Sequence, residues 1–285
     1  MLEDPKVKAW LGGLEPAWTL LDQESFGALR RPPDTPGSAM QLARDLTPGE
    51  IGQSAVASNM AILLRAAMEG PGLKLTATGN LSRNVVAEMV DRFSWPDFDK
   101  AEAFRFHKIV NEPDFLPLLF IRQIAEAMRF LRKSSGHVRT SPLGRAALDD
   151  ANLPALQALL FHVTMWHIDL SAFGRGLHGR WPQGDVGVVL WSLSVAANDW
   201  QSPERLTRLC TIPINSVVAP GWDSSSMMVE ARILRTLHWF GLLDHRREAI
   251  EGQRFGERHF YRKTKLFDRF LSFDVTTSAS TATRH

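Results

Sequence analysis

The chain has 285 residues, of which 44% are hydrophobic, and its formal net charge is +2. This apolar content suffices for one or two buried cores and excludes a wholly disordered chain. One cysteine excludes an internal disulfide, and the longest apolar run near the middle, residues 188–191, is far shorter than the ~20 residues that span a bilayer. We therefore expect a globular, cytoplasmic protein with no membrane partner.

The first 50 residues are predicted to form a helical lead-in, because short amphipathic pieces alternate there with glycine pairs and a proline-rich loop at residues 31–37. The tetrapeptide Thr-Pro-Gly-Glu at residues 47–50 has the form of a capping box with proline at the first helical position. Ser58 is predicted to cap the stronger helix that follows, and a Gly-Pro-Gly stop ends that helix at residues 70–72.

Residues 51–150 are predicted to form the first domain. Alternation predicts a short strand at residues 73–76, and a Gly-Asn turn then leads to a helix at residues 82–93. After a loop, another helix begins near Phe120, and a Ser-Ser-Gly turn and strand-like residues 137–140 follow it. The polar residues on the stripe of this helix that is predicted to be exposed are Arg122, Glu126, Arg129 and Lys133.

A helical and loop connector, residues 151–184, precedes a second predicted domain at residues 185–273. Its first helices are predicted at residues 186–197 and from Ser202-Pro203 onward, where the start signals are strong. The single cysteine, Cys210, is interpreted as a small buried hydrophobic residue of the second of these helices.

The next helix of this domain, residues 226–240, is predicted to point Arg232 and Arg235 away from its apolar side. Strands at residues 242–245 and 258–263 then flank a polar loop, and Thr264 caps a last helix. Residues 274–285 are small and polar and are predicted to form a disordered tail.

The two domains share a short sequence pattern. A shift of 123 places aligns residues 137–143 with residues 260–266, so that an apolar residue, arginine, Ser/Thr and leucine recur in the same order. Because the pattern falls at the same place in the same order of elements, we interpret it as two copies of one supersecondary unit.

Basic residues gather in both copies. Residues 117–148 contain six Lys or Arg and one acid, a net charge of +5, and residues 226–273 contain ten and six, a net charge of +4. The remainder therefore has a net charge of −7. Such clusters are either solvated faces or a surface for an anionic partner.

The order helix, strand, helix, basic helix and two-stranded hairpin resembles the winged-helix form of the helix-turn-helix DNA-binding domain. In the second copy the resemblance is carried by residues 202–209, by Arg232 and Arg235 on the reading helix, and by residues 246–262 as the wing. In the first copy the corresponding segments are residues 82–93, 122–132 and 132–139. Both copies join their helices by connections longer than the roughly 3–4-residue turn of that motif, so the basic helices either enter a DNA groove or pack inside the domain.

A fainter resemblance is carried by residues 72–81, Gly-Leu-Lys-Leu-Thr-Ala-Thr-Gly-Asn-Leu. This stretch is similar to a segment of uncharacterised, often plasmid-borne bacterial proteins.

The resemblances imply a mainly α fold of tandem winged-helix-like units with small β-hairpin wings. They imply a bacterial protein that binds duplex DNA as a regulator of transcription or plasmid maintenance, with no enzymatic activity and no bound cofactor. Phosphate contacts would come from long cations on the hairpins and helices. The residues assigned to DNA contact are Arg122, Arg129, Arg132, Lys133, Arg139, Arg232, Arg235, Arg246, Arg247, Arg258, Arg262 and Lys263.

A protein-interaction module is the alternative, because winged helices also bind proteins and a homodimer or another chain could cover the aromatic side chains. The aromatic residues assigned to such an interface are Trp191, Trp200, Trp222 and Trp239.

Three motifs suggest an enzyme less strongly. Residues 174–179 fit G-x-G-x-x-G with Asp199 downstream, but proline and glycine follow where a dinucleotide site needs a helix. His162, His167 and Asp169 are metal-type ligands, yet His167 points away from the other two on a helix, so packing is the favoured interpretation. His107, before Asn111 and Glu112, has similarly weak spacing.

Overall fold

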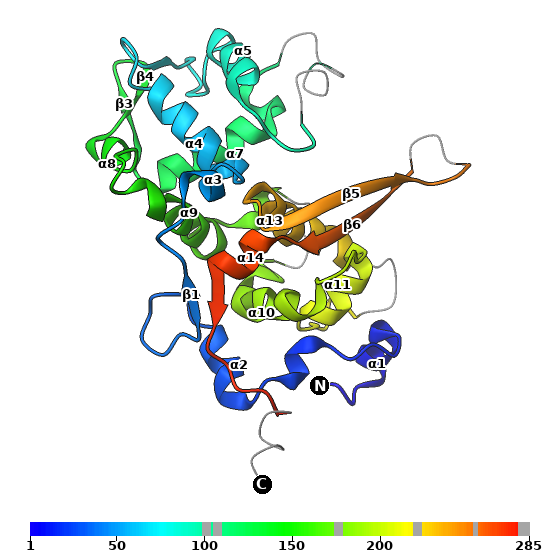
Figure 1. The fold of residues 1–285 in the computed structure, drawn as a ribbon. Helices are drawn as coiled ribbons and strands as arrows, with labels where there is room; N and C mark the ends of the chain where they lie inside the picture. Colours follow the sequence, from blue (N-terminus) through cyan, green and yellow to red (C-terminus); the bar gives the residue numbers. More distant parts are fainter. Residues whose placement is uncertain (99–103, 105–109, 174–178, 219–223, 253–255, 279–285) are drawn as a thin grey trace. The chain divides into compact units, whose positions relative to one another are not determined.

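The computed structural model describes residues 1–98, 104, 110–173, 179–218, 224–252 and 256–278. Roughly half of these residues are helical, and the strands form small antiparallel sheets (Figure 1). The chain divides into a continuous unit, Arg44–Thr164, and a discontinuous unit made of Met1–Ala43 and Met165–His285. No helix in the described residues is both long enough and apolar enough to cross a membrane.

The continuous unit consists of helices and one three-stranded sheet. Its helices are α3 (Pro48–Ile51), α4 (Ala55–Ala66), α5 (Arg83–Arg92), the 3-10 helix η2 (Glu112–Asp114), α7 (Leu116–Ala127), α8 (Pro142–Ala146) and α9 (Leu153–His162). Its strands are β2 (Leu73–Lys74), β3 (Leu131–Ser134) and β4 (His137–Thr140), in the order β2-β4-β3.

Local capping chemistry sets the starts of α3, α4 and α8 in this unit. The capping box at Thr47 is confirmed, with the Thr47 hydroxyl and the Glu50 carboxylate each accepting a backbone N–H. The prediction that Ser58 caps the next helix is wrong, because the Ser54 hydroxyl accepts the N–H of Ala57 at 3.2 Å and α4 begins one turn earlier. Ser141 caps α8 as predicted, through a 3.0 Å bond from the N–H of Gly144.

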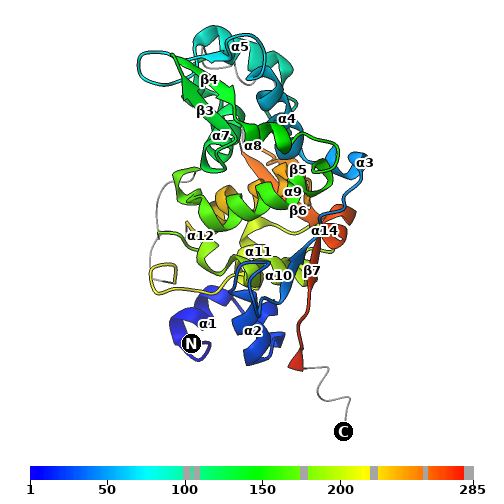
Figure 2. The same ribbon diagram turned by 90° about the vertical axis from the view of Figure 1, so that its left-hand side faces the viewer.

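The β3–β4 hairpin turns through two residues, Ser135 and Gly136, which both have positive φ (49° and 73°) (Figure 2). This geometry is that of a type I′ turn, whose twist matches that of the strands. At the other side of β4, an added Cβ on Gly72 would lie 2.5 Å from the carbonyl oxygen of Val138. Only glycine therefore allows β2 to approach β4 so closely.

The discontinuous unit contains more helices and two separate two-stranded pairings. Its helices are α1 (Pro5–Leu11), η1 (Ala17–Leu20), α2 (Gln23–Leu29), η4 (Leu170–Phe173), η5 (Gln183–Asp185), α10 (Val186–Ala196), α11 (Pro203–Cys210), α12 (Ser225–Val229), α13 (Arg235–Trp239) and α14 (Lys265–Phe270). A π-helical turn, η6 (Glu230–Leu234), joins α12 to α13, and another, η3 (Val163–His167), spans the boundary between the units. The strands are β1 (Met40–Leu42), β5 (Leu243–Ala249), β6 (Glu257–Lys263) and β7 (Leu271–Phe273).

The β5–β6 hairpin is longer than predicted. Residues 246–249 and 257, assigned to a polar loop, continue the two strands, which pair from Leu243↔Lys263 to Ala249↔Glu257. The hairpin projects from the helices of its unit (Figure 1). Its distal positions carry charges instead of alternating apolar residues, so the sequence lacked the usual strand pattern there.

A two-stranded pairing joins the N-terminal and C-terminal segments of the discontinuous unit. β1 pairs with β7, with Met40 opposite Phe273, although they are far apart in sequence. Beyond β7, Leu21 forms a β-bridge with Thr277, and the N–H of Asp274 donates to the carbonyl of Ala39 at 2.8 Å. The remainder of the predicted tail, residues 279–285, lies outside the described residues.

Candidate nucleic-acid interface

The outer face of the three-stranded sheet carries four basic side chains. Arg132 in β3 lies directly opposite Arg139 in β4, and Lys74 in β2 lies opposite His137 in β4. Because side chains alternate across a strand, these four share the face opposite the buried Val138. Arg132 and Lys74 are exposed, and Arg139 and His137 are half-buried.

No carboxylate of the described residues pairs with these four side chains. Arg139 instead makes a long 3.5 Å contact to the carbonyl oxygen of Gly70, and the His137 Nδ1 contacts that of Ser135 at 2.9 Å. Facing residues on a ladder have Cβ atoms ~4.5–5.5 Å apart, and like charges at that separation repel. An anion placed over Arg132 and Arg139 would relieve the repulsion.

The same hairpin region has two further exposed cations, Arg129 two residues before β3 and Lys133 within β3, where it pairs with Val138 and so lies on the other face. Arg129 has φ 56° at the end of α7, where the N–H of Phe130 bonds to the carbonyl of Ala125 at 2.8 Å. This left-handed position after a helix is usually taken by glycine. The Ser141 hydroxyl fixes it by donating a 2.7 Å bond to the Arg129 carbonyl.

Sequence reasoning assigned Arg129, Arg132, Lys133 and Arg139 to one basic set, and the structure brings these four to one hairpin and the helix end before it. Lys74 and His137 were missed. The sequence places Lys74 in a strand, but only the pairing of β2 with β4 puts it beside the arginines.

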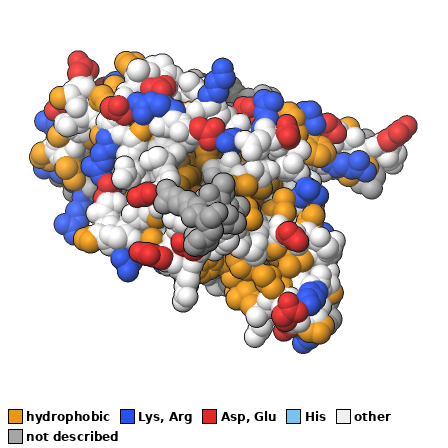
Figure 3. Space-filling model, turned by 60° about the horizontal axis from the view of Figure 1, so that its bottom comes forward, with side chains coloured by type: hydrophobic (Ala, Val, Ile, Leu, Met, Phe, Trp, Pro, Cys, Tyr) orange, Lys and Arg blue, Asp and Glu red, His pale blue; other side chains and the backbone are white. Residues whose placement is uncertain are grey.

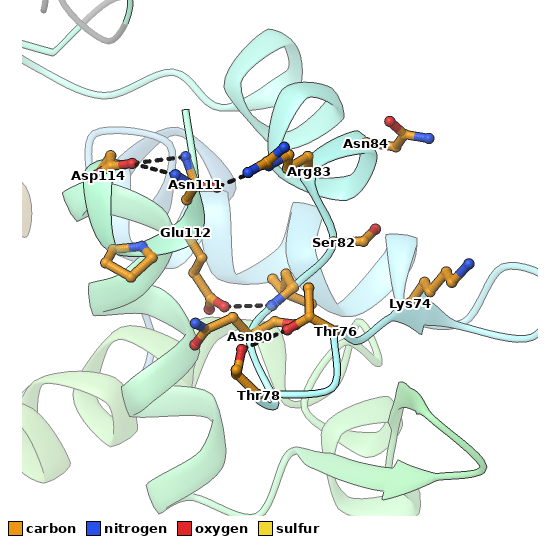
Figure 4. A pocket seen from close by; sticks show the side chains of 12 residues that line it. Lys74, Thr76, Thr78, Asn80, Ser82, Arg83, Asn84, Asn111, Glu112 and Asp114 are labelled. Carbon is orange, nitrogen blue, oxygen red and sulfur yellow. Dashed lines mark hydrogen bonds between the residues drawn. The ribbon is translucent and has the colours of Figure 1, made fainter. Parts of the chain in front are cut away.

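A polar pocket of about 640 Å³ begins at Lys74 and continues along the loop between β2 and α5 (Figure 4). Thr76 and Thr78 share a 2.9 Å hydrogen bond at its edge, and the Arg83 guanidinium donates to the Asn111 side chain at 3.1 Å. The stretch at residues 72–81 that resembles plasmid-borne proteins thus forms β2 and much of this pocket wall. The pocket extends the polar surface of the continuous unit beyond the sheet.

Arg122 does not lie on an exposed stripe, and that prediction is wrong. Its guanidinium is buried and donates to the Glu112 carboxylate at 2.5 Å, to Glu126 at 3.0 Å and to the carbonyl of Gly79 at 2.8 Å. Glu112 also accepts the N–H of Leu81 at 2.6 Å. A helical wheel could not reveal a carboxylate from outside the helix, and the pair fixes the pocket loop at Gly79 and Leu81.

Arg232 and Arg235 also depart from the prediction that they point outward. Arg232 is fully buried and donates to the backbone carbonyls of Gly179 and Trp181. Arg235 is partly buried, donates to the carbonyl of Phe173 at 3.3 Å and packs over Trp239. Burial lowers the pKa of both guanidinium groups, and neither offers a free charge to a large partner.

Carboxylates neutralise most cations of the β5–β6 hairpin and its end. The ion pairs are Arg246–Glu248 at 2.9 Å, Arg247–Glu257 at 3.6 Å, Arg262–Asp244 at 2.8 Å and Lys263–Asp268 at 2.8 Å. Arg258 is exposed and has no carboxylate partner in the part of the chain described. Figure 3 shows basic and acidic side chains interspersed on the face it presents, including the projecting hairpin.

The groups of described residues that could hold a metal ion do not include His162, His167 and Asp169 together. His162 belongs to the continuous unit, whereas His167 and Asp169 belong to the other, where hydrogen bonds from Ser171 lower the pKa of Asp169. Residues 174–178 of the glycine motif, and His107, lie outside the described residues. Cys210 is buried as predicted.

Comparison with known proteins gives a family-model match that lies almost wholly within the continuous unit. Residues 52–153 match the family model of the Y4jL N-terminal domain. The chain is 31% identical over 74 residues to uncharacterized protein y4jL of Sinorhizobium fredii (strain NBRC 101917 / NGR234), a match that covers 26% of this chain and 34% of that protein. It thus spans about a third of the relative's length. No solved structure matches the chain. The similarity fits the fainter resemblance noted for residues 72–81, which lie inside the matched segment.

Proposed function

We propose that the continuous unit binds duplex DNA by laying the outer face of its β2-β4-β3 sheet along the phosphate backbone. The observation that carries the proposal is the placement of Arg132 opposite Arg139, beside Lys74 and His137, with no acidic side chain on that face. When cations held close together in this way bind an array of phosphates, the counterions of the DNA are released, and this release favours binding. Arg129, an exposed cation two residues before β3, extends the contact along the chain, whereas Lys133 pairs with Val138 and lies on the other face of the sheet.

We further propose that both units are winged-helix domains. Two observations support this: the strand order β2-β4-β3 in the continuous unit, and the bridge from Gln201 to Tyr261, which gives β6 a second partner beside β5 in the other unit. In both units a helix, an extended segment, two further helices and a hairpin follow one another.

The helix before each hairpin packs inside its domain. α7 buries Arg122, and the residues it exposes include Glu126 and Ala127, so it presents no cation of its own to a groove. The sheet would therefore contact the phosphates and provide little sequence specificity. A cytoplasmic regulator of bacterial transcription or plasmid maintenance remains the role that we propose for this binding.

The proposal is tested with Arg132→Ala/Arg139→Ala in the full chain, by mobility shift with duplex DNA over a range of salt concentrations. Each lost phosphate contact removes about one unit from the slope of log affinity against log salt. We expect weaker binding to all sequences and a slope reduced by roughly two.

Arg205→Ala/Lys265→Ala is the matched control, because it removes the same charge from two exposed cations of the discontinuous unit that are not assigned to DNA contact. Equal losses in the two double variants would show attraction by net charge alone and contradict a site on the sheet. Absence of DNA binding by the unaltered chain at every salt concentration would favour the protein-interaction module.

The tryptophans assigned to that module are mostly covered. Trp191 and Trp239 are 5% and 4% exposed, and Trp200 lies under the guanidinium groups of Arg246 and Arg262. Trp222 lies outside the described residues. No aromatic patch in the described chain therefore favours the module over DNA.

A further inference from the structure

We propose that Glu230, His245 and His259 of the discontinuous unit form a binding site for a divalent transition-metal ion, and that zinc suits the site best. This site is separate from the basic sheet of the continuous unit and goes beyond DNA binding.

The three side chains offer ligand atoms that all lie within 4.8 Å of one another. Zinc binds imidazole nitrogens and carboxylate oxygens at ~2.0–2.2 Å, so two ligands of a tetrahedral ion are roughly 3.4 Å apart. The most distant ligand atoms of the cluster therefore need to approach by at most about 1.4 Å. Rotation about side-chain torsions allows a movement of that size.

The backbone explains why these residues meet. His245 pairs with Tyr261 and Arg247 pairs with His259, so the two histidines are diagonal neighbours on one face of the hairpin. Their ring centroids are 5.0 Å apart. Glu230 reaches the same point from the first residue of the π-helical turn η6. Single π-helical turns within α-helices are frequent at functional sites.

Neighbouring groups hold the cluster in place. The Tyr261 hydroxyl donates a 2.9 Å bond to Glu230, which also contacts the Nδ1 of His259. The Tyr261 ring stacks on His245 at 4.6 Å, and His238 meets the same histidine, His245, edge-on at 5.4 Å.

Solvent reaches one side of the cluster. A pocket of about 560 Å³ is lined by Ser202, Glu204, Glu230, Glu257, Arg258 and His259. Three carboxylates against one guanidinium favour a cation there. Two histidines and one carboxylate are a donor set of zinc sites that keep a fourth position for water or another ligand. The open side of this site gives such a ligand room.

The first test is a titration of the chelator-stripped full chain with zinc by calorimetry. We expect one equivalent to bind. His259→Gln and Glu230→Gln should each weaken affinity on the order of 100-fold or more, whereas Tyr261→Phe, which removes only a partner of a ligand, should weaken it ~10-fold. His167→Gln, at an exposed histidine of the same unit, should leave zinc affinity unchanged.

Cobalt(II) tests the unaltered protein without a risk of misfolding. An intense visible spectrum of a four- or five-coordinate ion, displaced by zinc, would support the site. A weak six-coordinate spectrum, no zinc binding, or equal affinities of the His259→Gln and His167→Gln variants would overturn it.

Discussion

Glu112 and Arg122 form an ion pair of 2.5 Å in which the side chains are 1% and 8% exposed. Neither group belongs to the basic sheet face, yet their hydrogen bonds hold the backbone of the adjoining loop at Leu81 and Gly79. Removing one partner would leave the other charge buried and uncompensated.

Arg122→Met is therefore expected to lower the free energy of unfolding by ~3–5 kcal/mol. The matched variant is Arg92→Met, which breaks the more exposed i,i+4 pair with Glu88 and should cost less than ~1 kcal/mol. Urea unfolding followed by circular dichroism measures both. Similar costs for the two variants would contradict a strongly coupled buried pair.

Arg129→Gly should separate stability from DNA binding. Arg129 adopts φ 56°, a left-handed conformation that costs a residue with a Cβ ~1–2 kcal/mol, so glycine should stabilise the fold by up to ~1 kcal/mol. The same variant should weaken DNA affinity and reduce the salt slope by about one. Arg132→Gly, in the middle of β3, should weaken DNA binding as well but destabilise the fold by ~0.5–1 kcal/mol. Stability changes of the same sign in both variants would refute the role of backbone strain.

Gly187→Ala should disrupt the contact between α10 and α2. An added Cβ at residue 187 would lie 1.9 Å from the carbonyl oxygen of Leu29, closer than any real contact. Because the backbone fixes the position of a Cβ and the atom it meets is a backbone oxygen, relief requires the helices to move, and we expect a loss of ~3 kcal/mol or more. Gly184→Ala, where a Cβ meets nothing within 4 Å, should change stability by less than ~0.5 kcal/mol. Thermal unfolding of the two variants tests the contrast.

Cys210 should resist thiol reagents in the folded protein. The side chain is buried at the end of α11, and burial raises the pKa of its thiol well above the ordinary value. Since the thiolate is the reactive form, labelling by a disulfide reagent should follow unfolding of the chain and accelerate with urea. Labelling in native buffer at the rate of an unstructured cysteine peptide would disprove this burial.

Capping chemistry was readable from the sequence. The starts of the helices at Thr47, Ser141, Ser202 and Thr264 were predicted from short motifs, and each of these side chains caps its helix in the structure. Such caps depend on residues within one turn, so no tertiary information is needed.

Features that depend on partners distant in the sequence could not be predicted. Arg122 and Arg232 sit on helices whose apolar spacing suggested outward arginines, but their acceptors are Glu112, outside the helix, and carbonyls more than 50 residues away. The cluster of Glu230, His245 and His259 depends likewise on strand register and a π-helical turn. Alternation in the hairpin sequence could have placed the two histidines on one face, but not Glu230 beside them.

The pairing of Met40 with Phe273 has a consequence for synthesis on the ribosome. All residues of Arg44–Thr164 have left the exit tunnel long before β7 is translated, so this segment can fold before the C-terminal part of the other unit is synthesised. β1 must meanwhile stay unpaired, with an exposed edge that other polypeptides can join. A premature stop before Leu271 would leave that edge open permanently, and aggregation of the truncated product should follow.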